Sequence, residues 1–112
     1  MAGIIKVFRI EPGKYGEIIT MRNSEADFRE EVGGELEFIS LCPTGGVLVD
    51  KDSNWKNVPF NCYLEEEMRT RIVKGTALAL SKHGATYSDI DDATLDALGE
   101  LTWRKDADSV VT

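Results

Sequence analysis

The feature that most constrains this chain is the step Val32-Gly33-Gly34, which joins a helical pattern to a strand pattern. Phe28 and Val32 lie four residues apart, a spacing that places both side chains on one side of a helix over residues 24–32. Glycine readily adopts the positive φ at which such helices end. Residues 35–41 then alternate between polar and apolar side chains, as in a strand. The sequence therefore predicts one short helix that passes directly into a strand.

The start of this helix has two candidate caps. Asn23 and Ser24 can each accept a hydrogen bond from the free amides of a first helical turn. Ser24 with Asp27 three residues later also gives a weak capping-box pattern. We expect one of these side chains to close the first turn.

Composition indicates a single soluble domain. A chain of 112 residues can bury one core, and 42% hydrophobic with 29% charged residues is typical of a globular protein. No apolar run approaches the roughly 20 residues that span a bilayer, so no membrane association is expected. The first apolar stretch contains Lys6 and Arg9 and does not resemble a signal peptide. We expect a cytoplasmic protein in which Cys42 and Cys62 are thiols rather than a disulfide.

The net charge of −7 is unevenly distributed along the chain. Residues 24–40 and residues 88–112 each sum to −5, whereas residues 1–23 sum to +2. A surface with this bias repels phosphate backbones, because binding them depends on clustered Lys and Arg. Generic nucleic-acid binding is therefore not expected. Solubility accounts for the acidity, and an acidic face that engages a basic partner is the alternative.

The remaining patterns predict hairpins, a loop and a second helix. The predicted strands are 4–11, 17–22, 35–41, 47–50 and 71–81. The first of these is apolar on both faces, which indicates a central position in the sheet. Residues 50–61 contain turn formers around Trp55 and are expected to form a structured loop.

The segment 62–82 is compatible with both helix and strand. Leu64, Met68 and Ile72 recur at a spacing of four, which favours a helix of about two turns. From Ile72 onward the apolar residues alternate, which favours a strand over residues 71–81 with Gly75 as a bulge or a point of close approach.

A final helix is expected after Asp91 or Ser88, either of which can cap it. Its apolar residues are Ile90, Leu95, Leu98 and Leu101, with Trp103 docked at its end. Residues 1–105 are thus predicted to form one α+β domain, a mainly antiparallel sheet of about five strands with both helices on one face. Residues 106–112 are predicted to be a disordered tail.

Two sequence patterns resemble metal sites, but each lacks residues that the metal requires. Asp50, Asp52 and Asn54 stand at positions one, three and five of a calcium loop. However, Trp55 replaces the glycine of the sharp turn, and Asn61 replaces the bidentate glutamate. A zinc site also lacks ligands, because the chain has one histidine and no cysteine at metal spacing. No metal, cofactor or catalytic constellation is predicted.

Three motifs resemble an uncharacterised family of small domains found in bacteriophages and other bacterial mobile elements. They are Glu11-Pro12-Gly13-Lys14, Val32-Gly33-Gly34-Glu35-Leu36-Glu37 and Val58-Pro59-Phe60-Asn61. The resemblance covers about residues 4–80. Asn57 stands where the family usually has glycine, and Cys62 stands where a basic residue often follows the asparagine. Because the family has no established activity, the resemblance implies a genomic setting, a phage or mobile element of a bacterial host cell, more than a mechanism.

The expected function is stoichiometric binding, since a small domain has little room for a catalytic cleft. The resemblance suggests an accessory protein that binds a host or defence component, either a protein surface or a small signalling metabolite at an oligomer interface. The candidate contact residues are Trp55, Asn57, Phe60 and Asn61, with Glu30, Glu31 and Glu35. The alternatives are a small enzyme that uses Cys62 or His83 and a virion-associated structural module. A homo-oligomer is compatible with each, because exposed edge strands need cover.

Overall fold

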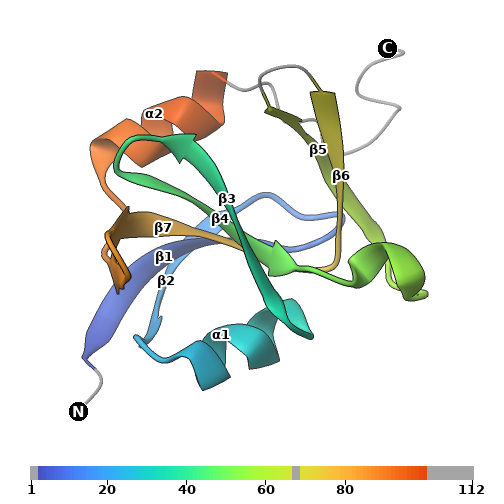
Figure 1. Cartoon of the computed structure of the whole chain (residues 1–112), viewed down its shortest axis with the longest axis horizontal. Helices are drawn as coiled ribbons and strands as arrows, with labels where there is room; N and C mark the ends of the chain where they lie inside the picture. Colours follow the sequence, from blue (N-terminus) through green and yellow to red (C-terminus); the bar gives the residue numbers. More distant parts are fainter. Residues whose placement is uncertain (1–2, 67–68, 101–112) are drawn as a thin grey trace.

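The computed structural model describes residues 3–66 and 69–100, which form an antiparallel sheet, a separate hairpin and two α-helices (Figure 1). The strands are β1 (Ile4–Ile10), β2 (Glu17–Arg22), β3 (Leu36–Cys42), β4 (Gly45–Asp50), β5 (Phe60–Glu66), β6 (Arg69–Lys74), β7 (Ala77–His83) and β8 (Thr86–Ser88). The helices are α1 (Glu25–Val32), the 3-10 turn η1 (Ser53–Trp55) and α2 (Asp92–Glu100). The predicted α+β class is confirmed, with a short helix after the first hairpin and a helix at the C-terminal side.

The main sheet has six strands in the order β2-β1-β7-β4-β3, with β8 paired to β7. Every pairing in it is antiparallel. The predicted central position of β1 is confirmed, since β1 lies between β2 and β7. Strands β5 and β6 form a two-stranded sheet of their own.

The two α-helices cover opposite faces of the main sheet, so the prediction of helices on one face was wrong. Figure 1 shows α1 on one side of the sheet and α2 on the other. Phe28 and Val32 of α1 pack in a core with Leu48 and Leu78, whereas Leu98 of α2 packs in a second core on the other face. The reason is that β4 and β7 are buried along both faces, so each face needs a cover.

Helix α1 ends as predicted but begins differently. Gly33 has a φ of 91°, and the amides of Gly33 and Gly34 both donate to the carbonyl of Arg29, at 2.8 and 3.1 Å. This is the expected glycine stop. Ser24 is the N-terminal cap residue in extended conformation, but its side chain makes no capping hydrogen bond. The predicted closure by a side chain at this end is therefore wrong.

Residues 62–66 and 69–72 lie in two paired antiparallel strands, so the helix suggested by Leu64 and Ile72 was wrong, while Met68 lies outside the described residues. Cys62 pairs with Val73 and both are buried, while the next pair, Tyr63 and Ile72, is more exposed. This alternation is that of a half-buried sheet, and the spacing of four was coincidental.

The predicted strand 71–81 is divided between two sheets. Gly75 has a φ of 77° and separates β6 from β7, so it is a turn residue rather than a bulge. An irregularity in strand pairing occurs instead between Phe60 and Cys62. Phe60 and Asn61 consequently belong to β5, not to the predicted loop.

Helix α2 is capped by Asp91. One carboxylate oxygen of Asp91 accepts from the Thr94 amide at 2.8 Å and from the Thr94 hydroxyl at 2.7 Å. Ser88 lies in β8 instead. The predicted contacts of Leu101 and Trp103 and the predicted tail 106–112 lie outside the described residues.

Asp91→Ala is expected to lower the free energy of unfolding by about 1 kcal/mol near neutral pH, because α2 loses its cap. Hydrogen bonds from the Thr94 side chain and the Thr94 amide lower the pKa of Asp91 from 3.8 to about 2. Since the folded pKa lies below the unfolded one, this stabilisation is present above about pH 4 and is lost as the pH falls through about 2.

Urea unfolding at a series of pH values measures this effect. Asp91→Asn is the control, because an amide can cap the helix but does not titrate. The difference in unfolding free energy between wild type and this variant should be constant above about pH 4 and shrink toward pH 2. A difference that stays constant over the whole range would contradict the assignment.

Candidate functional site

One end of the main sheet gathers most of the predicted contact residues. Strands β1 and β4 both finish there, beside the start of β7, as the pairs Ile10 with Ala77 and Leu48 with Leu78 show. The loops 11–16, 33–35 and 51–59 and the turn 75–76 lie at this end, which we call the loop end. The backbone of Lys51 donates to the carbonyl of Glu35 at 2.8 Å, which joins the loop after β4 to the loop after α1.

Trp55 is one of two strongly exposed aromatic residues of this loop end, with 87% of its surface exposed, and Tyr15 of the loop 11–16 is the other. It terminates η1, in which Ser53 is buried. The Trp55 amide donates to the carbonyl of Asp52 at 3.0 Å, and the Lys56 amide donates to that of Ser53 at 3.1 Å. A large apolar side chain is thus presented to solvent by a turn whose backbone is hydrogen-bonded and partly buried. Asn57, two residues later, is also exposed.

An ion pair between a buried carboxylate and a partly exposed ammonium anchors this turn. Asp50 is only 4% exposed, and its carboxylate lies 2.7 Å from the ammonium of Lys56. The same ammonium donates to the carbonyl of Gly33 at 3.0 Å, at the end of α1. The other carboxylate oxygen of Asp50 accepts from the Asp52 amide at 3.0 Å. The carboxylate of Asp50, the first residue of the calcium-loop pattern, therefore has an internal structural role, whereas Asp52 contributes its backbone.

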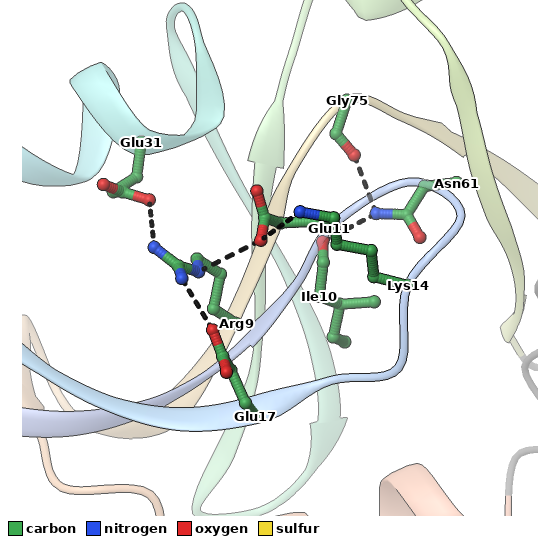
Figure 2. A network of polar contacts seen from close by, with 8 residues as sticks. All are labelled: Arg9, Ile10, Glu11, Lys14, Glu17, Glu31, Asn61 and Gly75. Atoms are coloured by element: carbon green, nitrogen blue, oxygen red, sulfur yellow. Dashed lines mark hydrogen bonds and ion pairs between the residues drawn. The ribbon is translucent and has the colours of Figure 1, made fainter.

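Asn61 has an internal role as well. It is fully buried, and its amide nitrogen donates to the carbonyls of Ile10, at 2.8 Å, and Gly75, at 2.7 Å (Figure 2). The side chain thereby joins the small sheet to the end of β1 and to the turn before β7. Phe60, which precedes it, is half-buried, and its ring lies 4.9 Å from that of Tyr63. Of this adjacent pair, only Phe60 reaches the surface.

The three predicted acidic residues differ in their availability. Glu31 lies 3.4 Å from the guanidinium of Arg9, which also contacts Glu17 at 2.7 Å and Glu11 at 3.7 Å (Figure 2). The hydrogen bond to Glu17 is the largest cause of the raised pKa of Arg9. This network joins β1, β2 and α1. Glu30 is exposed, and Glu35 is exposed with Arg29 at 3.9 Å.

The loop end is therefore a surface of exposed aromatic and acidic side chains above a set of internal polar contacts. Among the residues that the structure describes, no group of three or more acidic, histidine or cysteine side chains could hold a metal ion. None of the helices in this part of the chain is long and apolar enough to cross a bilayer.

Residues 5–102 match the model of a family described as "Domain of unknown function (DUF3846)". The chain belongs to this family. The match confirms membership of an uncharacterised family, but it runs from β1 through α2 and so extends beyond the expected residues 4–80. No curated protein and no solved structure matches it.

Sequence reasoning missed three surface residues of this DUF3846 domain. Tyr15 is 93% exposed in the loop between β1 and β2. Tyr63 and Ile72 form a cross-strand pair on the outer side of the β5–β6 hairpin, where Ile72 is 49% exposed. An aromatic residue between the turn residues Gly13 and Gly16 was a signal for Tyr15. The other two could be found only by reading residues 62–72 as strands.

The structure does not bring Cys62 and His83 of this DUF3846 domain together. Cys62 is 1% exposed in the core, next to Asn61, which bonds the turn before β7. His83 is exposed at the other end of β7, roughly 20 Å away for a seven-residue strand. Cys42 and Cys62 are not joined by a disulfide, as expected.

Cys42 lies beside the first turn of α2. Burial raises the pKa of its thiol, but hydrogen bonds with the hydroxyls of Thr94 and Thr44 and with the backbone of Thr44 and Gly45 outweigh burial and lower it overall. Both hydroxyl oxygens lie 3.6 Å from the sulfur. The Thr94 hydroxyl has one proton, which Asp91 accepts at 2.7 Å.

Proposed function

We propose that this DUF3846 domain is a binding protein whose loop end holds a protein partner in a fixed stoichiometry. The observation that carries the proposal is Trp55, an 87% exposed indole on a turn anchored by buried Ser53 and Asp50. An exposed tryptophan lowers solubility. Tryptophan is also enriched among the residues that dominate the binding energy at interfaces. A rigid turn also loses little conformational entropy on binding.

The internal polar contacts of the loop end support binding rather than chemistry. Asn61, Asp50 and Glu31 are each engaged with protein groups, in contacts that join β-strands, turns and α1. Of the predicted contact residues, those left at the surface are Trp55, Asn57, part of Phe60 and the acids Glu30 and Glu35. An aromatic anchor with a polar and charged rim is the usual anatomy of a protein–protein interface.

Within this proposal the partner is a host or defence component, and the protein is an accessory protein of a phage or mobile element. This narrower statement rests on the resemblance of the motifs Glu11-Pro12-Gly13-Lys14 and Val32-Gly33-Gly34. A protein surface is favoured over a small metabolite because Trp55 stands out from a turn, whereas metabolites are generally enclosed in concave sites.

Trp55→Ala is expected to reduce the amount of captured partner at least tenfold when tagged protein is incubated with a lysate of its own host cells. The reason is that an interface tryptophan typically contributes about 2 kcal/mol or more to binding. Quantitative mass spectrometry of the retained proteins measures the loss, and titration of the purified partner measures the stoichiometry.

Ile4→Ala is the matched control, since Ile4 is 65% exposed at the opposite end of β1. This variant should retain the partner as wild type does. Recovery of the wild-type protein alone would refute the binding function, and equal capture by the Trp55 and Ile4 variants would refute the assignment of the site.

A further inference from the structure

We propose that the Lys56–Asp50 ion pair is a positioning device that holds the Trp55 turn in its binding conformation before a partner arrives. The proposal deepens the proposed function, because it assigns residues that act on the binding site through Trp55 without contacting the partner. Lys56 and Asp50 are the positioning residues, and the carbonyl of Gly33 is the fixed point to which they attach the turn.

The turn is held from both sides of Trp55. Before it, Asp50 accepts the Asp52 amide at 3.0 Å, which orients the chain as it leaves β4. After it, Lys56 reaches back to Asp50 at 2.7 Å and to the carbonyl of Gly33 at 3.0 Å. The residues on either side of the indole are thereby connected to one buried carboxylate. Removing the ammonium would release the second attachment and leave the first in place.

The attachment point is itself rigid. Gly33 is the left-handed residue that ends α1, and α1 is fixed to the sheet by the buried side chains of Phe28 and Val32. Gly34 has no side chain between the helix end and the ion pair, and a Cβ there would lie 2.6 Å from a carboxylate oxygen of Asp50. The Gly33-Gly34 step therefore has a second role beyond ending α1, because it lets the loop after β4 approach the helix end.

The charges around the pair are consistent with this role. Lys56 is the lysine that reaches Asp50, whereas Lys51, next to Asp50 in sequence, is exposed and has no acidic partner among the described side chains. The ammonium of Lys56 also lies at the carboxyl end of α1, where a positive charge is favourable. Lys51 is therefore a suitable control for Lys56, because it lies in the same loop but does not form the ion pair with Asp50.

The experiment measures the mobility of the turn by nitrogen-15 relaxation in the full chain, for the amides of residues 53–56 and the indole of Trp55. In wild type we expect order parameters near 0.85, the value of a rigid backbone. In Lys56→Met we expect values below about 0.6, the range of a flexible loop. Lys51→Met should match wild type.

Two further variants keep the test decisive if Lys56→Met is too unstable. The double variant Asp50→Asn with Lys56→Met leaves no unpaired buried charge and should also mobilise the turn. Gly34→Ala keeps both charges but displaces them sterically, with the same expected result. Order parameters that stay near 0.85 in the double variant would overturn the positioning role.

The experiments distinguish a failure of the positioning role from a failure of the proposed binding function. If the turn is rigid in wild type and mobile in the variants, but the protein captures no partner, the positioning role is retained and the binding function is refuted. If capture of the partner requires Trp55 but is equal for wild type and the double variant, the binding function is retained and the positioning role is refuted.

Discussion

Phe28→Ala is expected to lower the free energy of unfolding by about 3–5 kcal/mol. Phe28 is fully buried and is the largest side chain with which α1 packs against the sheet. Its ring also makes an edge-on contact with that of Tyr87, with centroids 5.5 Å apart. Truncation would leave a cavity between α1 and the sheet that Leu48 and Leu78 cannot fill without moving from their strands.

Chemical unfolding monitored by circular dichroism measures this change. The control is Glu30→Ala, an exposed position on the same helix, for which a change within about 0.5 kcal/mol is expected. Since a domain of this size is usually stable by about 5–15 kcal/mol, the Phe28 variant should fold only marginally or unfold at moderate temperature. A loss below about 1 kcal/mol would show that α1 contributes little to the core.

Asn61→Ala is expected to lower the free energy of unfolding by about 2–4 kcal/mol, because two buried hydrogen bonds are lost together. The carbonyls of Ile10 and Gly75 would lose the amide donor now at 2.8 and 2.7 Å. Each buried polar group left without a partner costs about 1–3 kcal/mol. Because these bonds join the small sheet to the main sheet, we also expect faster hydrogen exchange in β5 and β6 than elsewhere.

Asn57→Ala is the matched control, since Asn57 is an exposed asparagine of the preceding loop. Its stability should be unchanged within about 0.5 kcal/mol. Equal stability of the two variants would contradict the structural role of Asn61. A loss of stability in Asn61→Ala with uniform exchange across both sheets would instead show that the sheets unfold as one unit.

The elements that were predicted correctly are those whose signals are local. The helix over residues 24–32 and its glycine stop were readable because Phe28, Val32 and Gly33 act within two helical turns. The hairpins β1–β2 and β3–β4 were readable because the loop 11–16 and the turn 43–44 that join their strands contain glycine or proline. The helix predicted near residues 64–72 was wrong because it depended on only three apolar residues spaced by four. The burial of the paired residues Cys62 and Val73 in a sheet outweighs this weak helical signal.

The binding role of the candidate contact residues stays a prediction, but the structure shows where they lie. Trp55 and Asn57 are exposed, and Glu35 lies at the same end of the sheet, where Lys51 bonds its carbonyl. Asn61, in contrast, could not be assigned from its neighbours, because its burial depends on carbonyls 51 and 14 residues away in sequence. An asparagine in a polar stretch has the same local appearance whether it meets solvent or a buried carbonyl.

The sequence by itself determined the short elements of this protein, its acidic character and the glycine step that ends α1. Periodicity, glycine φ preference and charge act over a few residues, so they can be read directly. Only the tertiary structure decided that the helices cover opposite faces, that β5 and β6 form their own sheet, and that Lys56 fixes the Trp55 turn to α1. Those outcomes depend on contacts between distant segments, where burial of both faces of β4 and β7 outweighs local preference.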